Sequence, residues 1–177
     1  MSVQKLLFKV IVVGDGGIGK STMIQRLTTG HFIPQKITIG TDLATYDLQI
    51  SNKTTVKLQI WDFAGEKRFR FFLPNYSRGA LGVLLCYDIT RFVSFENLSE
   101  WYEIVSTNAP EATIILVGGK LDLATEKRAV DIDLAKEFQT QHNIPCFFET
   151  SSKSGANNQK IFETLTRAII GKKKIPI

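Results

Sequence analysis

A glycine-rich segment, GDGGIGKS, follows the apolar run LFKVIVV near the start of the chain. It matches the pattern G-x-x-x-x-G-K-[ST] from Gly14 to Ser21. The glycines let backbone N–H groups turn inward around phosphate oxygens, and Lys20 supplies a positive charge for the outer phosphates. The alternative is a glycine-rich turn that merely joins a strand to a helix, but the full motif in its strand-loop-helix context favours phosphate binding.

A nucleotide phosphate carries too much charge for one lysine, so we expect Mg²⁺ to share it. Ser21 would offer its hydroxyl to the ion, and the helix that follows directs the positive end of its dipole at the phosphates. Asp62 ends a later predicted strand, where a parallel sheet presents its ligand-binding edge, and is the natural candidate to hold Mg²⁺ through water. Taken alone, Asp62 would be interpreted as a helix N-cap.

The composition is that of a single globular domain. A chain of 177 residues, 44% hydrophobic and 22% charged, is long enough to bury a substantial core and too short for two comfortable ones. No apolar run approaches the roughly 20 residues of a membrane span, and the first residues are too interrupted for a secretory signal. We therefore expect a cytoplasmic protein. Cys86 and Cys146 lie in apolar runs and are expected to be inert core thiols.

The net charge of +5 comes from scattered lysines and arginines, with one cluster, GKKK, near the C-terminus. No basic face with interleaved aromatic residues is evident, so we expect no nucleic-acid partner. The basic tail suits solvation and contact with acidic lipid equally well. It contains no cysteine that would accept a lipid, so peripheral association with a membrane surface stays open.

Apolar runs alternate with segments of helical period, which is typical of an α/β domain with a mostly parallel sheet and helices on both faces. The second and third runs are joined by the short turn SNKT, which suits only an antiparallel hairpin and so predicts one antiparallel edge strand. The six predicted strands are LFKVIVVG (7–14), ATYDLQI (44–50), TVKLQIWD (55–62), GVLLCYD (82–88), TIILVGG (113–119) and CFFET (146–150).

Two segments carry apolar side chains at helical spacing, and each stripe is expected to lie on the sheet. Ser94 and Asp131 are the expected N-caps of the third and fourth helices. The stretch TTGHFIPQKITIGT (28–41) is the longest irregular segment, and loops of that length are usually functional. The two apolar stripes consist of Phe95, Leu98, Tyr102 and Val105, and of Ile161, Phe162, Leu165 and Ile169.

In this arrangement the chain resembles the small GTPases of the Ras superfamily, and most closely the Rab branch. The resemblance covers essentially the whole chain and includes the phosphate loop, TIG (38–40), WDFAGEKRF (61–69), RGALGVLLCYDIT (78–90), GGKLD (118–122) and ETSSKSG (149–155). It implies a P-loop G domain over residues 1–171, followed by a short basic tail at 172–177. It also implies a guanine-nucleotide switch that hydrolyses GTP with Mg²⁺.

The resemblance assigns roles at the base. Asp122 is similar to the carboxylate that accepts from the N1 and N2 protons of guanine, which adenine does not present there. Lys120 resembles the residue whose stem lies along the base. The backbone N–H of Ser152 would meet the guanine O6, and Ser151 and Lys153 would support that loop.

Two further segments resemble the switches of the family, over residues 29–41 and 62–76. Thr38 would join Mg²⁺ only when a γ-phosphate is present, and the N–H of Gly65 would meet the same phosphate. The aromatic density of RFRFFLPNY suggests a surface for effectors, exchange factors and GTPase-activating proteins. Alternatively, some of Phe69, Phe72 and Tyr76 pack beneath a short helix. We expect a monomer.

The expected functional residues fall into three sets. Those assigned to catalysis are Lys20, Gly65 and Glu66, and those assigned to the metal are Ser21, Thr38 and Asp62. Those assigned to the nucleotide are Asp15, Gly16, Gly17, Ile18, Gly19, Lys20, Ser21, Thr22, Thr38, Gly65, Lys120, Asp122, Leu123, Ser151, Ser152 and Lys153.

Some positions depart from the family pattern. Gly119 stands where the family has an asparagine that touches the base and braces the phosphate loop, so we predict that Gly119→Asn tightens guanine-nucleotide binding. Phe63 replaces a usual threonine and Leu43 a usual phenylalanine, which alters the hydrophobic surface between the switches.

Glu66 stands where the family has a glutamine that orients the attacking water. A carboxamide accepts from that water and donates to a phosphate oxygen, whereas a carboxylate only accepts. No arginine of the switches is placed as an internal finger, and Arg68 and Arg70 are expected at the surface, so we predict slow turnover without a partner. The rival hypothesis is a module of the same fold that binds nucleotide with little or no hydrolysis.

Overall fold

The six apolar runs of the sequence form the six strands of one sheet, in the order β2-β3-β1-β4-β5-β6. The computed structural model describes residues 3–177. Neighbouring strands are parallel except for β2 and β3, which pair antiparallel through the SNKT turn. This confirms the mostly parallel sheet with one antiparallel edge. The strands are β1 (Gln4–Val13), β2 (Thr41–Ser51), β3 (Thr54–Phe63), β4 (Gly82–Asp88), β5 (Thr113–Gly119) and β6 (Cys146–Glu149).

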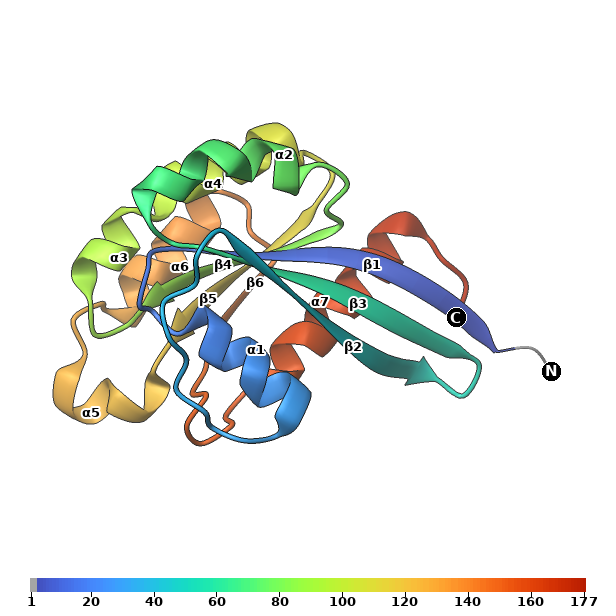
Figure 1. The fold of residues 1–177 in the computed structure, drawn as a ribbon, viewed down its shortest axis with the longest axis horizontal. Coiled ribbons are helices and arrows are strands. Elements are labelled where there is room, and N and C mark those ends of the chain that lie inside the picture. The colour runs from blue at the N-terminus through green and yellow to red at the C-terminus, as the bar shows by residue number, and fades with distance from the viewer. Residues whose placement is uncertain (1–2) are drawn as a thin grey trace.

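Helices cover both faces of the sheet. Figure 1 shows α1 and α7 on one side, and α2, α3, α4 and α6 on the other. The helices are α1 (Lys20–Thr29), α2 (Leu73–Ser77), α3 (Phe92–Glu96), α4 (Leu98–Asn108), α5 (Ala124–Lys127), α6 (Ile132–Gln141) and α7 (Asn158–Lys173). Two 3₁₀ segments, Lys67–Phe72 and Leu121–Leu123, precede α2 and α5. The expected domain boundary at residue 171 stays a prediction, and α7 continues past it to Lys173.

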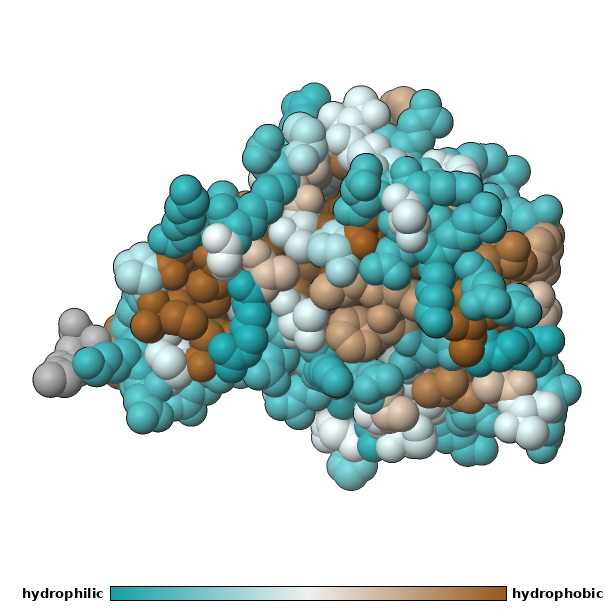
Figure 2. Space-filling view, turned by 180° about the vertical axis from the view of Figure 1, so that it is seen from behind, coloured by the Kyte–Doolittle hydropathy of each residue, from teal (hydrophilic) through white to brown (hydrophobic). Residues whose placement is uncertain are grey.

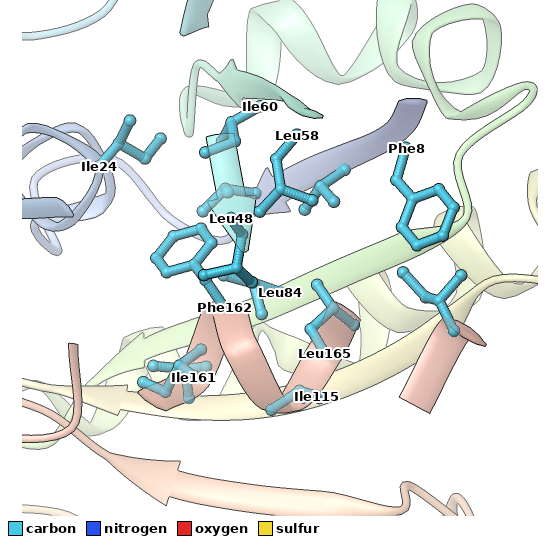
Figure 3. Packing of buried hydrophobic residues seen from close by; sticks show 14 of the residues in the cluster. Phe8, Ile24, Leu48, Leu58, Ile60, Leu84, Ile115, Ile161, Phe162 and Leu165 are labelled. Carbon is cyan, nitrogen blue, oxygen red and sulfur yellow. The ribbon is translucent and has the colours of Figure 1, made fainter. Parts of the chain in front are cut away.

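The core divides into two clusters because successive strand residues point to opposite faces. Along β1, Val10 and Val12 face α1 and α7, whereas Ile11 and Val13 face the other helices. Figure 3 shows Phe162 and Leu165 of α7 packed against Leu84 of the sheet. Fully burying a side chain of this size contributes about 1.5–3 kcal/mol, so these contacts stabilise the packing of α7 on the sheet.

The helix starts agree with the sequence at one of the two expected caps. The Asp131 carboxylate accepts from the N–H of Asp133 at the start of α6, which confirms this cap. The expectation for Ser94 is wrong, because Ser94 lies inside α3 and is buried. Its hydroxyl instead accepts from the N–H of Asp88 and donates to the carbonyl of Arg91, so it closes the turn that follows β4.

The parallel strands β1, β3, β4, β5 and β6 present their carboxyl ends at one edge of the sheet, where loops of a parallel sheet bind ligands. The expected site residues should therefore meet at this edge.

No helix among residues 3–177 is long and apolar enough to cross a membrane. Seen from behind, the surface of the molecule shows hydrophobic patches separated by hydrophilic side chains (Figure 2).

Candidate functional site

The loop from Gly14 to Gly19 joins β1 to α1 and turns sharply at its glycines. Gly19 has a φ of 98° and immediately precedes α1. This left-handed conformation is strained for residues with a side chain, which explains why a glycine occupies this position. The first N–H groups of α1 have no partner within the helix and are directed at the same place, so the loop and the helix together form a cradle suited to an anion.

Lys20 begins α1 and is buried beside this loop. Its ammonium donates to the carbonyl oxygens of Gly14, at 2.8 Å, and Asp15, at 2.7 Å. Burial lowers the pKa of Lys20, and the nearby carboxylate of Asp62 acts in the opposite direction. A desolvated cation next to the phosphate loop favours binding of a negatively charged group.

Ser21, Thr38 and Asp62 form one cluster, although they come from a helix, an irregular loop and a strand. The Ser21 and Thr38 hydroxyl oxygens lie 2.7 Å apart. Ser21 donates to Oδ2 of Asp62, and Thr38 Oγ1 lies 3.4 Å from the same oxygen. Burial raises the pKa of Asp62, partly opposed by the hydrogen bond from Ser21. The three residues assigned to the metal from the sequence therefore lie together.

This cluster fits Mg²⁺ by its chemistry. Mg²⁺ prefers oxygen ligands and usually takes only one or two carboxylates, with water and phosphate oxygens for the rest. Oδ1 of Asp62 is buried and has no hydrogen-bond partner among residues 3–177, which is unfavourable unless another group satisfies it. Those residues contain no group of three or more His, Cys, Asp or Glu side chains that could hold a metal ion, so Mg²⁺ here would depend on Asp62, the two hydroxyls and the ligand itself.

Gly65 brings the segment after β3 against the phosphate loop. A Cβ on Gly65 would lie 2.1 Å from the nitrogen of Gly16 and 2.2 Å from the carbonyl carbon of Asp15, which no side chain tolerates without movement. The next residue, Glu66, lines the same cavity as Gly16. Its carboxylate lies 2.8 Å from Nε of Arg68, and its side chain is 37% exposed. Glu66 therefore stands at the rim of the cavity, held toward Arg68.

The other end of the cavity, where the sequence predicts a base, is built from the loops after β5 and β6. The Lys120 ammonium forms an ion pair of 2.7 Å with the buried carboxylate of Asp88 and lies 3.5 Å from the carbonyl oxygen of Gly17. Asp122 accepts a hydrogen bond of 2.7 Å from Ser151. Ser151 thus fixes the carboxylate expected to meet the base.

Gly119 lies between these two ends. A Cβ added there would meet the carbonyl oxygens of Ile18 and Tyr87 at 3.5 Å, an ordinary contact distance. The backbone therefore has room for a larger residue at this position. Because glycine has no side chain, nothing from position 119 reaches the Ile18 carbonyl of the phosphate loop.

These groups surround one cavity of about 400 Å³. Three expected residues, Asp15, Asp62 and Ser151, do not line it, although each is hydrogen-bonded to a residue that does, namely Lys20, Ser21 and Asp122 in turn. Sequence reasoning missed several lining residues, and Phe32 had one available signal, an aromatic side chain in the long irregular stretch. The expected residues that line the cavity are Gly16, Gly17, Ile18, Gly19, Lys20, Ser21, Thr22, Thr38, Gly65, Glu66, Lys120, Asp122, Leu123, Ser152 and Lys153. The missed residues are Met23, Phe32, Pro34, Gln35, Lys36, Ile37, Cys86, Tyr87, Val117 and Thr150.

Asp15 directs its carboxylate away from the cavity, toward α4. It accepts from Asn97 at 2.7 Å and from the indole N–H of Trp101 at 2.8 Å. Arg70 lies 3.5 Å from the same carboxylate, pairs with Glu100 and stacks over the Trp101 ring at 4.3 Å. The expectation that Arg70 is a surface residue is wrong, since its side chain is only 13% exposed. This network ties the segment before α2 to the back of the phosphate loop.

The aromatic residues of this segment divide between core and surface. Phe69 and Tyr76 pack against the core, as the alternative expectation held for some of them. Phe71 and Phe72 are exposed. The expectation of inert core thiols holds best for Cys86, which is buried and whose pKa is raised by burial to about 12, while Cys146 is half-buried and both thiols are free.

Comparison with known proteins matches the chain to one family and to several of its members. The sequence profile described as the Ras family matches residues 9–171. The chain is 41% identical over 174 residues to the Ras-related protein RABA2a of Arabidopsis thaliana, covering 96% of this chain and 79% of that protein. It is 41% identical over 165 residues to the GTP-binding protein ypt1 of Schizosaccharomyces pombe, covering 92% and 80%. The Ras-related protein YPTC6 of Chlamydomonas reinhardtii is also 41% identical, with 92% and 75% covered.

Proposed function

Because the chain belongs to the Ras family and is a Rab-like small GTPase that switches between GTP and GDP, we propose that the cavity described above holds the nucleotide and that hydrolysis is slow without a partner. One observation carries the proposal. A single cavity is lined by the phosphate loop, by Thr38, Gly65 and Glu66, and by Lys120 and Asp122 at its other end. Groups suited to a base and to a chain of phosphates thus face the same space.

Ser21, Thr38 and Asp62 would hold Mg²⁺ at the phosphate end, supported by their mutual contacts and by the unpartnered Oδ1 of Asp62. The ion would neutralise charge that develops on the β- and γ-phosphates. Lys20 would bind phosphate oxygens, and the N–H of Gly65 would meet the γ-phosphate. Loss of that phosphate would remove one partner of Gly65 and one of Thr38, which releases both segments.

Slow hydrolysis is inferred from Glu66. Its carboxylate accepts from water but cannot donate to a phosphate oxygen, and like charge opposes its approach to the γ-phosphate. The contact with Arg68 holds the carboxylate at the cavity rim. A glutamine of the same length would orient the water without this repulsion.

The test is a single-turnover measurement of phosphate release from GTP-loaded protein, with Mg²⁺ and with excess EDTA. We expect slow release that EDTA abolishes, and release about tenfold faster for Glu66→Gln, because about 1.4 kcal/mol of barrier corresponds to tenfold in rate. No release over many hours from the wild type would overturn the proposed hydrolysis. Slower release by Glu66→Gln would show instead that the carboxylate acts as a useful base.

Regulatory partners would bind at the two switch segments, because large apolar side chains are exposed there. Ile37 and Ile39 are 74% and 76% exposed, and Phe71 is 82% exposed. Leu43 is also exposed, whereas Phe63 is buried, so of the two departures from the Rab pattern only Leu43 changes this surface directly. The kinship with Rab and Ypt proteins supports action in the cytoplasm, peripheral to membranes.

A further inference from the structure

Arg91 follows β4, outside both switch segments, and its side chain turns back over the phosphate loop. Nη1 donates to the carbonyl oxygen of Gly16 at 2.9 Å. The same nitrogen lies 3.5 Å from the position that a Cβ on Gly17 would occupy. Gly16 and Gly17 both line the cavity. The guanidinium therefore lies at the outer rim of the loop proposed to hold the phosphates.

The positive charge of Arg91 has no carboxylate partner within ion-pair distance in the described part of the chain, residues 3–177. Arg68, Arg70 and Arg128, by contrast, each pair with a carboxylate. The charge of Arg91 also reaches Lys20, whose pKa it lowers in addition to the larger effect of burial. Lys20 and Arg91 thus both donate to carbonyl oxygens of this loop, and their positive charges favour an anion bound there.

The arginines of the second switch are otherwise engaged. Arg68 contacts Glu66, and Arg70 is enclosed by Glu100, Asp15 and the Trp101 ring. Moving Arg70 to the cavity would break a buried ion pair, which is strongly unfavourable. Arg91 is exposed, is joined to the loop by one hydrogen bond of one nitrogen, and keeps its other donors for a ligand.

We propose that Arg91 supplies, from the same chain, an arginine that stabilises the phosphate charge while GTP is hydrolysed. The inference rests on the proposed function, because it needs the phosphates to lie in the loop from Gly14 to Ser21. In the reaction the water oxygen bonds to the γ-phosphorus as the bond to the β–γ bridging oxygen breaks, and GDP leaves with that electron pair. One water proton stays on the released phosphate and the other passes to solvent.

Arg91 is suited to this step by its place. Negative charge moves toward the bridging and β-phosphate oxygens as the bond breaks, and backbone N–H groups of a phosphate loop face those oxygens. A guanidinium hydrogen-bonded to the Gly16 carbonyl would add positive charge beside this loop. Because Arg91 is exposed, solvent and salt screen it, so we expect about 10- to 100-fold in rate rather than the 10³–10⁵ of a fully enclosed finger.

The experiment compares single-turnover GTP hydrolysis by the wild type, Arg91→Ala and Arg91→Lys in Mg²⁺. Arg167→Ala serves as the control, since Arg167 lies on α7 and pairs with Glu163. We expect Arg91→Ala to lose about 10- to 100-fold in rate while its GDP affinity stays within about twofold. Arg91→Lys keeps the positive charge but lacks the planar set of guanidinium donors, so its hydrolysis rate should fall less than that of Arg91→Ala. The wild type should also bind GDP with aluminium fluoride, a mimic of the transferring phosphoryl group, whereas Arg91→Ala should not.

Two outcomes overturn the inference alone. In the first, the wild type hydrolyses GTP and Arg91→Ala matches it within a factor of two. In the second, Arg91→Ala loses affinity for GDP and GTP equally with its turnover unchanged, so that Arg91 only holds the loop. If the wild type releases no phosphate, the proposed hydrolysis itself fails and the inference with it, which separates the two failures.

Discussion

The two ends of the proposed nucleotide cavity, the phosphate end and the base end, differ in the number of side-chain contacts that organise them. At the phosphate end, Lys20 makes two hydrogen bonds, and Ser21, Thr38 and Asp62 contact one another. At the base end, Asp122 is fixed by Ser151, but Gly119 contributes no side chain to join the base to the loop. If the nucleotide binds as proposed, we expect the phosphates to be held more firmly than the base.

The largest effect is expected at the phosphate end. Lys20→Ala removes a buried ammonium that would meet two phosphates, and hydrogen bonds to charged groups contribute about 1.5–3 kcal/mol each. We expect GTP and GDP affinity to fall about 100-fold or more, measured by titration calorimetry. Lys57→Ala is the control, because Lys57 pairs with Asp47 on the surface of the β2–β3 hairpin. A loss smaller than tenfold would show that the loop backbone dominates binding.

A smaller effect is expected from the carboxylate at the base end. Asp122→Ala should bind GDP and inosine diphosphate with equal affinity, because inosine diphosphate differs from GDP only in lacking the exocyclic amine of guanine. The wild type should prefer GDP by about 10- to 100-fold, since one hydrogen bond to a charged group is at stake. Competition of both nucleotides against a fluorescent GDP analogue measures the ratio. An unchanged preference in Asp122→Ala would mean that the base is recognised elsewhere.

The smallest effect is expected at Gly119, and it should be a gain. Gly119→Asn places an amide beside the Ile18 carbonyl, where a Cβ finds ordinary contact distances of 3.5 Å. One additional neutral hydrogen bond contributes about 0.5–1.5 kcal/mol, so guanine-nucleotide affinity should rise up to about tenfold. Dissociation of labelled GDP, chased with unlabelled nucleotide, gives the off-rate.

Gly119→Ala is the matched control for that variant, because it adds the Cβ without the amide. We expect its off-rate to equal that of the wild type. If Gly119→Asn binds GDP no more tightly than Gly119→Ala does, the missing side chain at residue 119 does not explain the difference between the two ends of the cavity.

Much of the fold was accessible from the sequence, because long apolar runs and a short polar turn leave few arrangements. The apolar runs predicted to end near Gly14, Asp88 and Gly118 are the central strands β1, β4 and β5, and the SNKT turn joins the antiparallel pair at the edge. The motifs with fixed spacing also predicted most residues that line the cavity. Local patterns succeed where the contact partners lie within one strand-loop-helix unit.

The failures involve partners far apart in the chain. Nothing near Arg70 in the sequence indicates that Trp101 and Asp15 enclose it. Arg91 reaches Gly16 only because the chain turns after β4, and that turn depends on the hydrogen bonds of Ser94. Phe32 and Lys36 line the cavity from an irregular segment, where no helical or strand periodicity predicts which side chains point inward.

The close approach of Gly65 to the phosphate loop limits how this protein can diverge from its relatives. A single methyl group at residue 65 would overlap backbone atoms of Asp15 and Gly16, so every substitution there forces one segment to move. A substitution that preserves this close approach must therefore fall on a neighbouring residue. Phe63 and Glu66, the two residues here that differ from the pattern the chain resembles, lie two positions before and one position after Gly65, outside the contact itself.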